Sequence, residues 1–127
     1  MLDYRKYIVW QKSHQLVLDM YKVTATYLRS EQFNLISQIN RACLSIPTNI
    51  AEGCGRETQK ELIRYLYISS GSAHELEYLI LVSKDLNFIS ENLYFKLNSD
   101  INEIKKMVAA LIRKVAETVT VNCQLKT

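Results

Sequence analysis

Apolar residues recur at steps of three and four through four long segments of this chain, and this spacing predicts four α-helices. We expect helices over about 9–28, 31–52, 58–86 and 90–118. One proline and three glycines in 127 residues are too few for a turn-rich sandwich or barrel, and too few for a disordered chain. The sequence therefore predicts one all-α domain, long enough to bury a core without disulfides or metals.

Polar residues at the segment boundaries indicate where the helices begin and end. Ser30 and Ser90 are suited to cap helix N-termini, because a serine oxygen accepts a hydrogen bond from a free backbone N–H. Thr58 and Glu61 have the spacing of a capping box, in which the two side chains satisfy reciprocal backbone donors. Gly53 is expected to end the second helix in the left-handed conformation that glycine favours.

The connections between the segments are short, which favours antiparallel neighbours. They cover roughly residues 29–30, 53–57 and 87–89. The predicted fold is therefore an antiparallel up-down-up-down four-helix bundle over residues 1–118. Residues 119–127 lose the apolar period, and we expect them to form a frayed tail. Pro47 lies inside the second segment, where it should kink the helix; a complete break there is the alternative.

Two neighbouring apolar stripes along the third segment indicate contacts with two other helices. One stripe consists of Leu62, Leu66, Ser69, Ala73, Leu76, Ile80 and Ser83. The other consists of Tyr65, Ile68, Ser72, Glu75, Leu79, Val82 and Leu86. Gly71 lies in a run of small residues, and since glycine costs about 1 kcal/mol relative to alanine inside a helix, we expect another helix or an aromatic ring to approach it closely. Gly71→Leu is therefore expected to destabilise the bundle by roughly a few kcal/mol.

A polar stripe runs along the second segment and extends past its end. It consists of Arg41, Ser45, Asn49, Glu52 and Arg56. Two interpretations remain open: a solvated face, or a hydrogen-bonded seam between helices or subunits. Glu75 lies on an apolar stripe of the third segment, where a buried carboxylate needs a cationic or donor partner. Arg41 or Arg56 is the natural candidate for that partner.

No combination of residues has the spacing of a catalytic, cofactor or metal site. His14 and His74 lack a partner at i+4 that would form a metal clamp. Glu75 and Glu77 are about 200° apart around a helix, so they cannot act as one carboxylate pair. The Gly53-Cys-Gly55 segment follows a helix rather than a strand and completes no phosphate-binding motif. We expect a protein that is not an enzyme and that uses no cofactor.

The three cysteines, Cys43, Cys54 and Cys123, have neither CxxC spacing nor the pattern of a disulfide framework. The N-terminal residues lack the apolar stretch of a signal peptide. The longest strictly aliphatic run covers residues 79–82, so no membrane span is expected. Scattered thiols without a signal peptide favour a reducing compartment, and we expect a cytoplasmic protein.

The net charge of +3 is modest but unevenly distributed. Residues 1–64 carry nine basic and six acidic side chains (+3), residues 65–103 two and six (−4), and residues 104–127 five and one (+4). A basic fourth helix beside an acidic third one favours electrostatic pairing or a one-sided basic surface. Seven basic residues are expected to contact nucleic-acid phosphates: Lys105, Lys106, Arg113, Lys114, Arg5, Lys6 and Lys12. The first four belong to the fourth helix, where we expect them on the side away from its apolar seam.

Three groups of residues carry a resemblance to a known family. The first is Asp3-Tyr-Arg-Lys6 with Val9-Trp-Gln-Lys12. The second is Ser45-Ile-Pro-Thr-Asn-Ile-Ala-Glu-Gly53, followed by Gly55-Arg56. The third comprises Glu61, Gly71-Ser72 and Glu75-Leu76-Glu77. With these residues the chain resembles, over about residues 3–115, the bacterial four helix bundle protein family, whose members include proteins encoded in intervening sequences of 23S ribosomal RNA genes.

The resemblance implies an antiparallel four-helix bundle that forms a ring-shaped homopentamer and has no catalytic residues. A relative, the accessory variability determinant of diversity-generating retroelements, has a basic surface and works with a reverse transcriptase and nucleic acid. The residues that the resemblance marks as fold and assembly determinants are Arg41, Asn49, Glu52, Arg56 and Glu75. Gly71 joins them as a predicted structural residue.

These observations together suggest a non-enzymatic, homo-oligomeric scaffold or adaptor, with a pentamer as the expected assembly. The expected partners are RNA or DNA, a ribonucleoprotein, or a nucleic-acid-processing protein. Five copies of a +3 chain would carry about +15, and repetition around a ring converts weak contacts into useful avidity. The alternative is a protein-interaction module with no affinity for nucleic acid.

Overall fold

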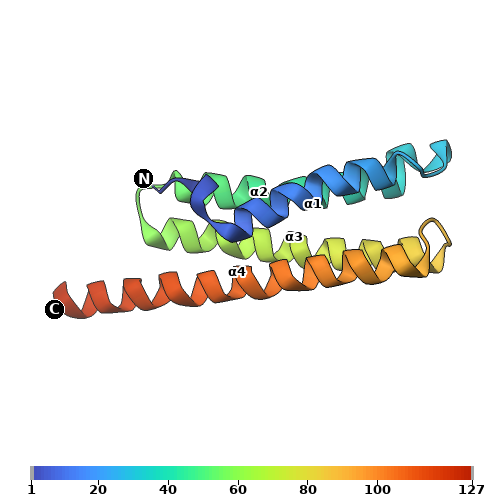
Figure 1. Cartoon of the computed structure of the whole chain (residues 1–127). Helices are drawn as coiled ribbons and strands as arrows, with labels where there is room; N and C mark the ends of the chain where they lie inside the picture. The colour runs from blue at the N-terminus through green and yellow to red at the C-terminus, as the bar shows by residue number, and fades with distance from the viewer. Residues whose placement is uncertain (1, 127) are drawn as a thin grey trace.

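The chain folds into four long α-helices that pack as an antiparallel bundle (Figure 1). The computed structural model describes the backbone of residues 2–126 and the side chains of residues 2–119. The helices are α1 (Ile8–Thr24), α2 (Ser37–Cys54), α3 (Gln59–Asp85) and α4 (Glu91–Lys126). The largest interface joins α2 to α3, and α1 lies mainly against α2 and more loosely against α4. The predicted all-α, up-down-up-down bundle is confirmed.

The core follows the predicted apolar stripes most closely on α3. Every member of its first stripe, from Leu62 to Ser83, is buried. The second stripe is buried only in part, since Leu79 is inside whereas Ile68 and Glu75 are exposed. The second stripe lies at the edge of the contact between α3 and its neighbours. Some of its residues are therefore buried and others are exposed. Two packed stripes were expected, and the structure contains one and part of another.

The N-termini of α3 and α4 are capped as predicted. The hydroxyl of Thr58 accepts a hydrogen bond from the Glu61 N–H at 3.1 Å. The hydroxyl of Ser90 accepts one from the Leu93 N–H, also at 3.1 Å. The reciprocal half of the expected capping box does not form, because the Glu61 carboxylate accepts hydrogen bonds from Arg64 instead.

The connection from α1 to α2 is more elaborate than expected. α1 ends earlier than the predicted residue 28, and a 3₁₀ turn, η2 (Arg29–Glu31), and a short π-helix, η3 (Gln32–Ile36), precede α2. Ser30, the expected N-cap, lies within η2 and caps nothing. The Glu31 carboxylate caps η3, accepting from the Leu35 N–H at 3.4 Å, and α2 itself begins without a side-chain cap. Another 3₁₀ turn, η1 (Tyr4–Lys6), lies before α1.

Gly53 has a different role from the predicted left-handed terminator. It lies inside α2 and is buried, and no described glycine has a positive φ. α2 is terminated by Gly55, in a right-handed conformation. A Cβ at Gly53 would lie 2.9 Å from Leu62 Cδ1 and 3.0 Å from Tyr65 Cβ. Glycine is therefore favoured here, because a Cβ would force the Leu62 and Tyr65 side chains of α3 to shift.

Gly71, where close approach was expected, is exposed, and a Cβ there would meet nothing within 4 Å. The expectation that Gly71→Leu destabilises the bundle is therefore wrong for the single chain. Periodicity identifies which helices contain small residues. It does not identify where two helix axes come closest.

Pro47 is buried inside α2, which continues on both sides of it, so the alternative of a broken helix is wrong. Proline has no backbone N–H, so α2 lacks one hydrogen bond at this position and nevertheless continues past it. The backbone of α4 is helical to Lys126, although a frayed tail was expected from residue 119. Loss of the apolar period thus does not mark the end of the helix. Within the part of the chain that the structure describes, no helix is both long and apolar enough to span a membrane.

Candidate interaction surfaces

The polar stripe of α2 divides between a hydrogen-bonded seam and solvent. Asn49 Nδ2 donates to the carbonyl oxygen of Ser45 at 2.8 Å and to its hydroxyl at 2.9 Å. The Ser72 hydroxyl of α3 donates to the same Ser45 hydroxyl at 2.8 Å. Arg41 and Glu52 are exposed. Both open interpretations are therefore correct for different residues, and the hydrogen-bonded part ties α2 to α3.

Arg56 lies at the turn from α2 to α3 and contacts the Tyr65 side chain. Its guanidinium donates to the Tyr65 hydroxyl at 2.5 Å and lies 4.8 Å from the ring centroid. Glu75 is exposed, and within residues 2–119 it forms no ion pair with Arg41 or Arg56. The prediction of a buried, arginine-paired Glu75 is wrong, because its stripe turns toward solvent at this position.

Three of the seven predicted phosphate-contacting residues are paired with carboxylates: Arg5, Lys12 and Lys105. Arg5 contacts Asp3 at 3.1 Å and Lys12 contacts Glu103 at 2.8 Å. Both pairs are largely exposed, so each retains access to solvent.

Lys105 contradicts its predicted position away from the apolar seam of α4. Its ammonium donates to Glu77 of α3 at 2.9 Å, and its side chain is mostly buried. The hydrogen bond from Lys105 is the main reason that the pKa of Glu77 lies below its ordinary range, with a smaller effect in the same direction from Asn102. Lys105 therefore pairs α3 with α4 and is withdrawn from the phosphate-binding set.

Four of the predicted basic residues are exposed and form no ion pair with any described residue. They are Lys6, Lys106, Arg113 and Lys114. We call these four residues the free basic set. Lys6 precedes α1, and the other three lie on α4. Of the seven residues predicted to contact phosphates, these four have a charge that no described carboxylate neutralises.

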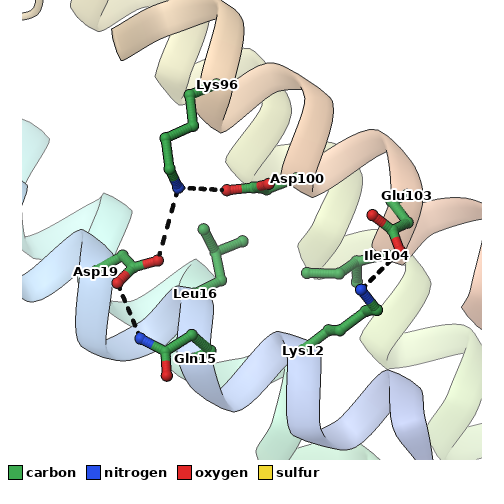
Figure 2. Close-up of a pocket in the computed structure, with 8 residues that line it drawn as sticks. All are labelled: Lys12, Gln15, Leu16, Asp19, Lys96, Asp100, Glu103 and Ile104. Carbon is green, nitrogen blue, oxygen red and sulfur yellow. Dashed lines mark hydrogen bonds and ion pairs between the residues drawn. The ribbon is translucent and has the colours of Figure 1, made fainter.

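A charged groove separates the middle of α1 from α4 (Figure 2). Lys96 of α4 contacts Asp100 at 2.9 Å and reaches toward Asp19 of α1 at 3.9 Å. Figure 2 shows Leu16 and Ile104 pointing into the space between these ion pairs. The helices are joined here by charged side chains spanning a gap, in contrast to the packed seam between α2 and α3.

A second, more apolar groove lies between the start of α1 and α4. Its lining consists of Lys6, Tyr7, Ile8, Val9, Met107, Ala110, Leu111 and Lys114. Ile8 is 59% exposed although it is the first residue of α1. We call this feature the Lys6–Lys114 groove. Two members of the free basic set line it, on opposite helical elements.

Titratable groups with catalytic potential occupy structural positions. The His14 ring stacks on Trp10 with centroids 5.0 Å apart, and His74 Nδ1 lies 2.8 Å from the Ser70 carbonyl oxygen. Burial raises the pKa of the Cys43 thiol to about 12, which leaves it protonated and unreactive at neutral pH. No group of three or more histidines, cysteines and acidic residues in the described part of the chain is placed to hold a metal. Cys123 lies outside the described side chains.

The exposed side of α3 carries a regular stripe that the sequence analysis missed. It consists of Tyr67, Gly71, His74, Tyr78 and Leu81. The steps of four, three, four and three are those of a coiled-coil seam. Tyr67 is 62% and Tyr78 64% exposed, so the described residues leave most of each of these side chains uncovered. We call this the outer stripe of α3; its heptad spacing was readable from the sequence once the inner stripes had been assigned.

An antiparallel bundle of this kind belongs to the class of small four-helix bundle proteins. The sequence matches the family described as 23S rRNA-intervening sequence protein over residues 5–110, and the chain belongs to this family. A crystal structure of a protein with unknown function from the S23 ribosomal protein family of Bacteroides thetaiotaomicron is similar, with a TM-score of 0.78 and 25% sequence identity. The similarity covers 84% of this chain and 96% of that chain. A comparison with proteins of curated function finds no match.

Proposed function

We propose that this chain is a non-enzymatic, homo-oligomeric scaffold or adaptor that self-associates through the outer stripe of α3. The observation that carries the proposal is the combination of exposed Tyr67 and Tyr78 rings with coiled-coil spacing. Exposed aromatic side chains in a regular apolar row are typical of protein contacts, because tyrosine buries a large area at a low entropic cost.

Gly71 supports the same interpretation. A glycine inside a helix costs about 1 kcal/mol relative to alanine, and nothing within the chain requires one at this position. Gly71 lies between the two tyrosines in the outer stripe, where a missing side chain would let a second helix approach the backbone. The sequence predicts that another helix approaches Gly71 closely, and we propose that this helix belongs to a second subunit.

A ring of five chains is the assembly that we propose, following the family resemblance. In such a ring the free basic set would recur in every subunit, and weak contacts to one partner would add through avidity. Arg41 and Glu52, exposed on α2, are proposed as further assembly residues. The partner is proposed to be nucleic acid, a nucleic-acid-processing protein or another protein. The free thiols of Cys43 and Cys54 favour placement in the reducing cytoplasm.

Mass measurement by light scattering over a concentration series tests self-association. The variants are Gly71→Leu, which fills the proposed contact, and Tyr78→Ser, which removes a ring. Leu28→Ser, at a residue 62% exposed on the α1–α2 connection, is the matched control. We expect an oligomer for the wild type and the control, and a shift toward monomer for both stripe variants with unchanged helical content. A monomeric wild type, or stripe variants of unchanged mass, would contradict the proposal.

A further inference from the structure

The Lys6–Lys114 groove combines an aliphatic floor with a basic rim. From this combination we infer that the groove docks an acidic amphipathic helix of a partner protein, with aliphatic side chains on the floor and carboxylates against the lysines. The inference rests on the proposed adaptor function and names the chemistry of its partner.

The floor is aliphatic and partly uncovered. Ile8 is 59% exposed, Met107 and Leu111 are half-buried, and Ala110 is small and exposed. A row of this kind gains free energy when aliphatic side chains cover it, and an unbranched methionine adapts its shape to them. Phosphates and sugars would leave this floor exposed to water.

The rim carries positive charge that the described residues leave unpaired. Lys6 and Lys114 form no ion pair, and Glu117, one turn beyond Lys114, is not within contact distance of it. Lys6 and Lys114 therefore place two unpaired cations in the lining of the groove, and carboxylates on a partner would complement them. Lys106 and Arg113 are further exposed cations on α4, outside the lining.

The start of α1 adds to this positive potential. Its N-cap, Tyr7, makes no side-chain capping bond, and the first turn contains no acidic residue. The free N–H groups there carry the positive end of the helix dipole. Because this helix end lies in the lining of the groove, the dipole and the lysines favour the same sign of ligand charge.

The groove's shape favours a helix over a nucleic acid. Its α4 side comprises Met107, Ala110, Leu111 and Lys114, which span about 10 Å, or two turns. This length matches the i, i+3, i+4 and i+7 anchors of a helix lying in an apolar groove. Single-stranded nucleic acids bind through stacking on aromatic rings, whereas the only ring in the lining belongs to half-buried Tyr7.

Fluorescence anisotropy with the full-length oligomer tests the inference. The probe is a fluorescein-labelled helical peptide with leucines at i, i+3, i+4 and i+7 and glutamates at most other positions. One control peptide replaces the leucines with glutamines, and a second replaces the glutamates with lysines. A labelled single-stranded DNA oligonucleotide provides the nucleic-acid arm. We expect saturable binding of the probe alone, at least tenfold tighter than binding of either control peptide.

Two variants with matched controls locate the binding. Lys114→Glu reverses a rim charge, and Lys22→Glu makes the same change at the far end of α1. Ile8→Ser removes the exposed floor residue, and Leu28→Ser makes a similar change at an equally exposed position. We expect about tenfold weaker probe binding for the two groove variants and unchanged binding for the two controls.

Three results would overturn the inference. The first is no probe binding at low salt, and the second is equal binding of the leucine-free peptide, which would show that only charge is recognised. The third is tighter binding of the oligonucleotide with loss on Lys114→Glu but not on Ile8→Ser, which would assign the surface to nucleic acid. If the protein is monomeric but still binds the probe at the groove, the proposed self-association is refuted and the docking inference stands. Failure of one proposal can therefore be distinguished from failure of the other.

Discussion

The seam between α2 and α3 and the seam between α1 and α4 are built on different principles. At the first seam Gly53 lets the backbone of α2 come within contact distance of Leu62, and the Ser69 hydroxyl donates to the Ile46 carbonyl oxygen at 3.0 Å. At the second seam the helices are separated by two grooves and bridged by ion pairs such as Lys12–Glu103. The first seam is closed by close backbone approach, whereas at the second exposed ion pairs span a groove above buried residues such as Leu16 and Ile104.

This difference assigns stability to one side of the bundle and accessibility to the other. Packed seams resist separation because each buried side chain contacts many neighbours. Exposed ion pairs contribute little, because water and salt screen them. We therefore expect the α2–α3 seam to define the fold and the α1–α4 seam to remain available to a partner.

The largest expected effect is at Leu66, which is fully buried in α3. Leu66→Ala should lower the free energy of unfolding by about 2–5 kcal/mol, because it leaves a cavity among residues that cannot fully collapse. Urea unfolding followed by circular dichroism provides the measurement. A loss below about 1 kcal/mol would show that the packed seam does not carry the stability.

Gly53→Ala is expected to have the next largest effect. The added Cβ would meet Leu62 and Tyr65, so we expect a loss of roughly 1–3 kcal/mol from overpacking. Gly71→Ala is the matched control. It should be neutral or stabilise the single chain by up to about 1 kcal/mol, since alanine favours the helix and meets no atom there. Equal effects at both glycines would contradict the assigned close approach.

The Lys105–Glu77 pair predicts a smaller, pH-dependent effect. Because the pKa of Glu77 is lowered in the folded chain by its hydrogen bond from Lys105, the pair stabilises the fold above the ordinary glutamate pKa. That contribution, about 1 kcal/mol or less, is lost as the pH falls through the lowered value. Glu77→Gln should therefore reduce stability at pH 7 and converge with the wild type in acid, once the pH lies below the lowered pKa of Glu77. A difference that does not shrink on acidification would refute the assignment.

The smallest effect is expected for Lys12→Gln at the α1–α4 seam. Both partners of the Lys12–Glu103 pair are about half exposed, so their attraction is screened. The midpoint of urea unfolding should not change measurably at 0.15 M salt. A clear loss of stability, comparable with that of Gly53→Ala, would remove the distinction between the two seams.

Much of the fold was predictable from local signals. Helix number, the inner stripe of α3 and the Thr58 and Ser90 caps follow from rules that act over one or two turns. Positions that depend on how helices cross were not predictable in this way. The close approach expected at Gly71 occurs at Gly53 instead, because the point of closest approach is a property of the whole bundle.

The interaction surfaces were predictable only in part. Lys106, Arg113 and Lys114 are exposed on α4 as expected. Lys6 is also exposed and lines the Lys6–Lys114 groove. Lys105 was misplaced because a charged side chain at the edge of an apolar seam can turn toward a neighbouring carboxylate. The outer stripe of α3 was overlooked, although its spacing was visible in the sequence.

The central claim is that the outer stripe of α3 forms the contact between copies while the α1–α4 seam stays open. Hydroxyl-radical footprinting of the full chain, at concentrations below and above self-association, tests it most directly. Oxidation of Tyr67 and Tyr78 reports on the outer stripe, and oxidation of Met107 reports on the Lys6–Lys114 groove. The account predicts protection of both tyrosines on association with Met107 unchanged. Protection of Met107 with both tyrosines still oxidised would contradict it.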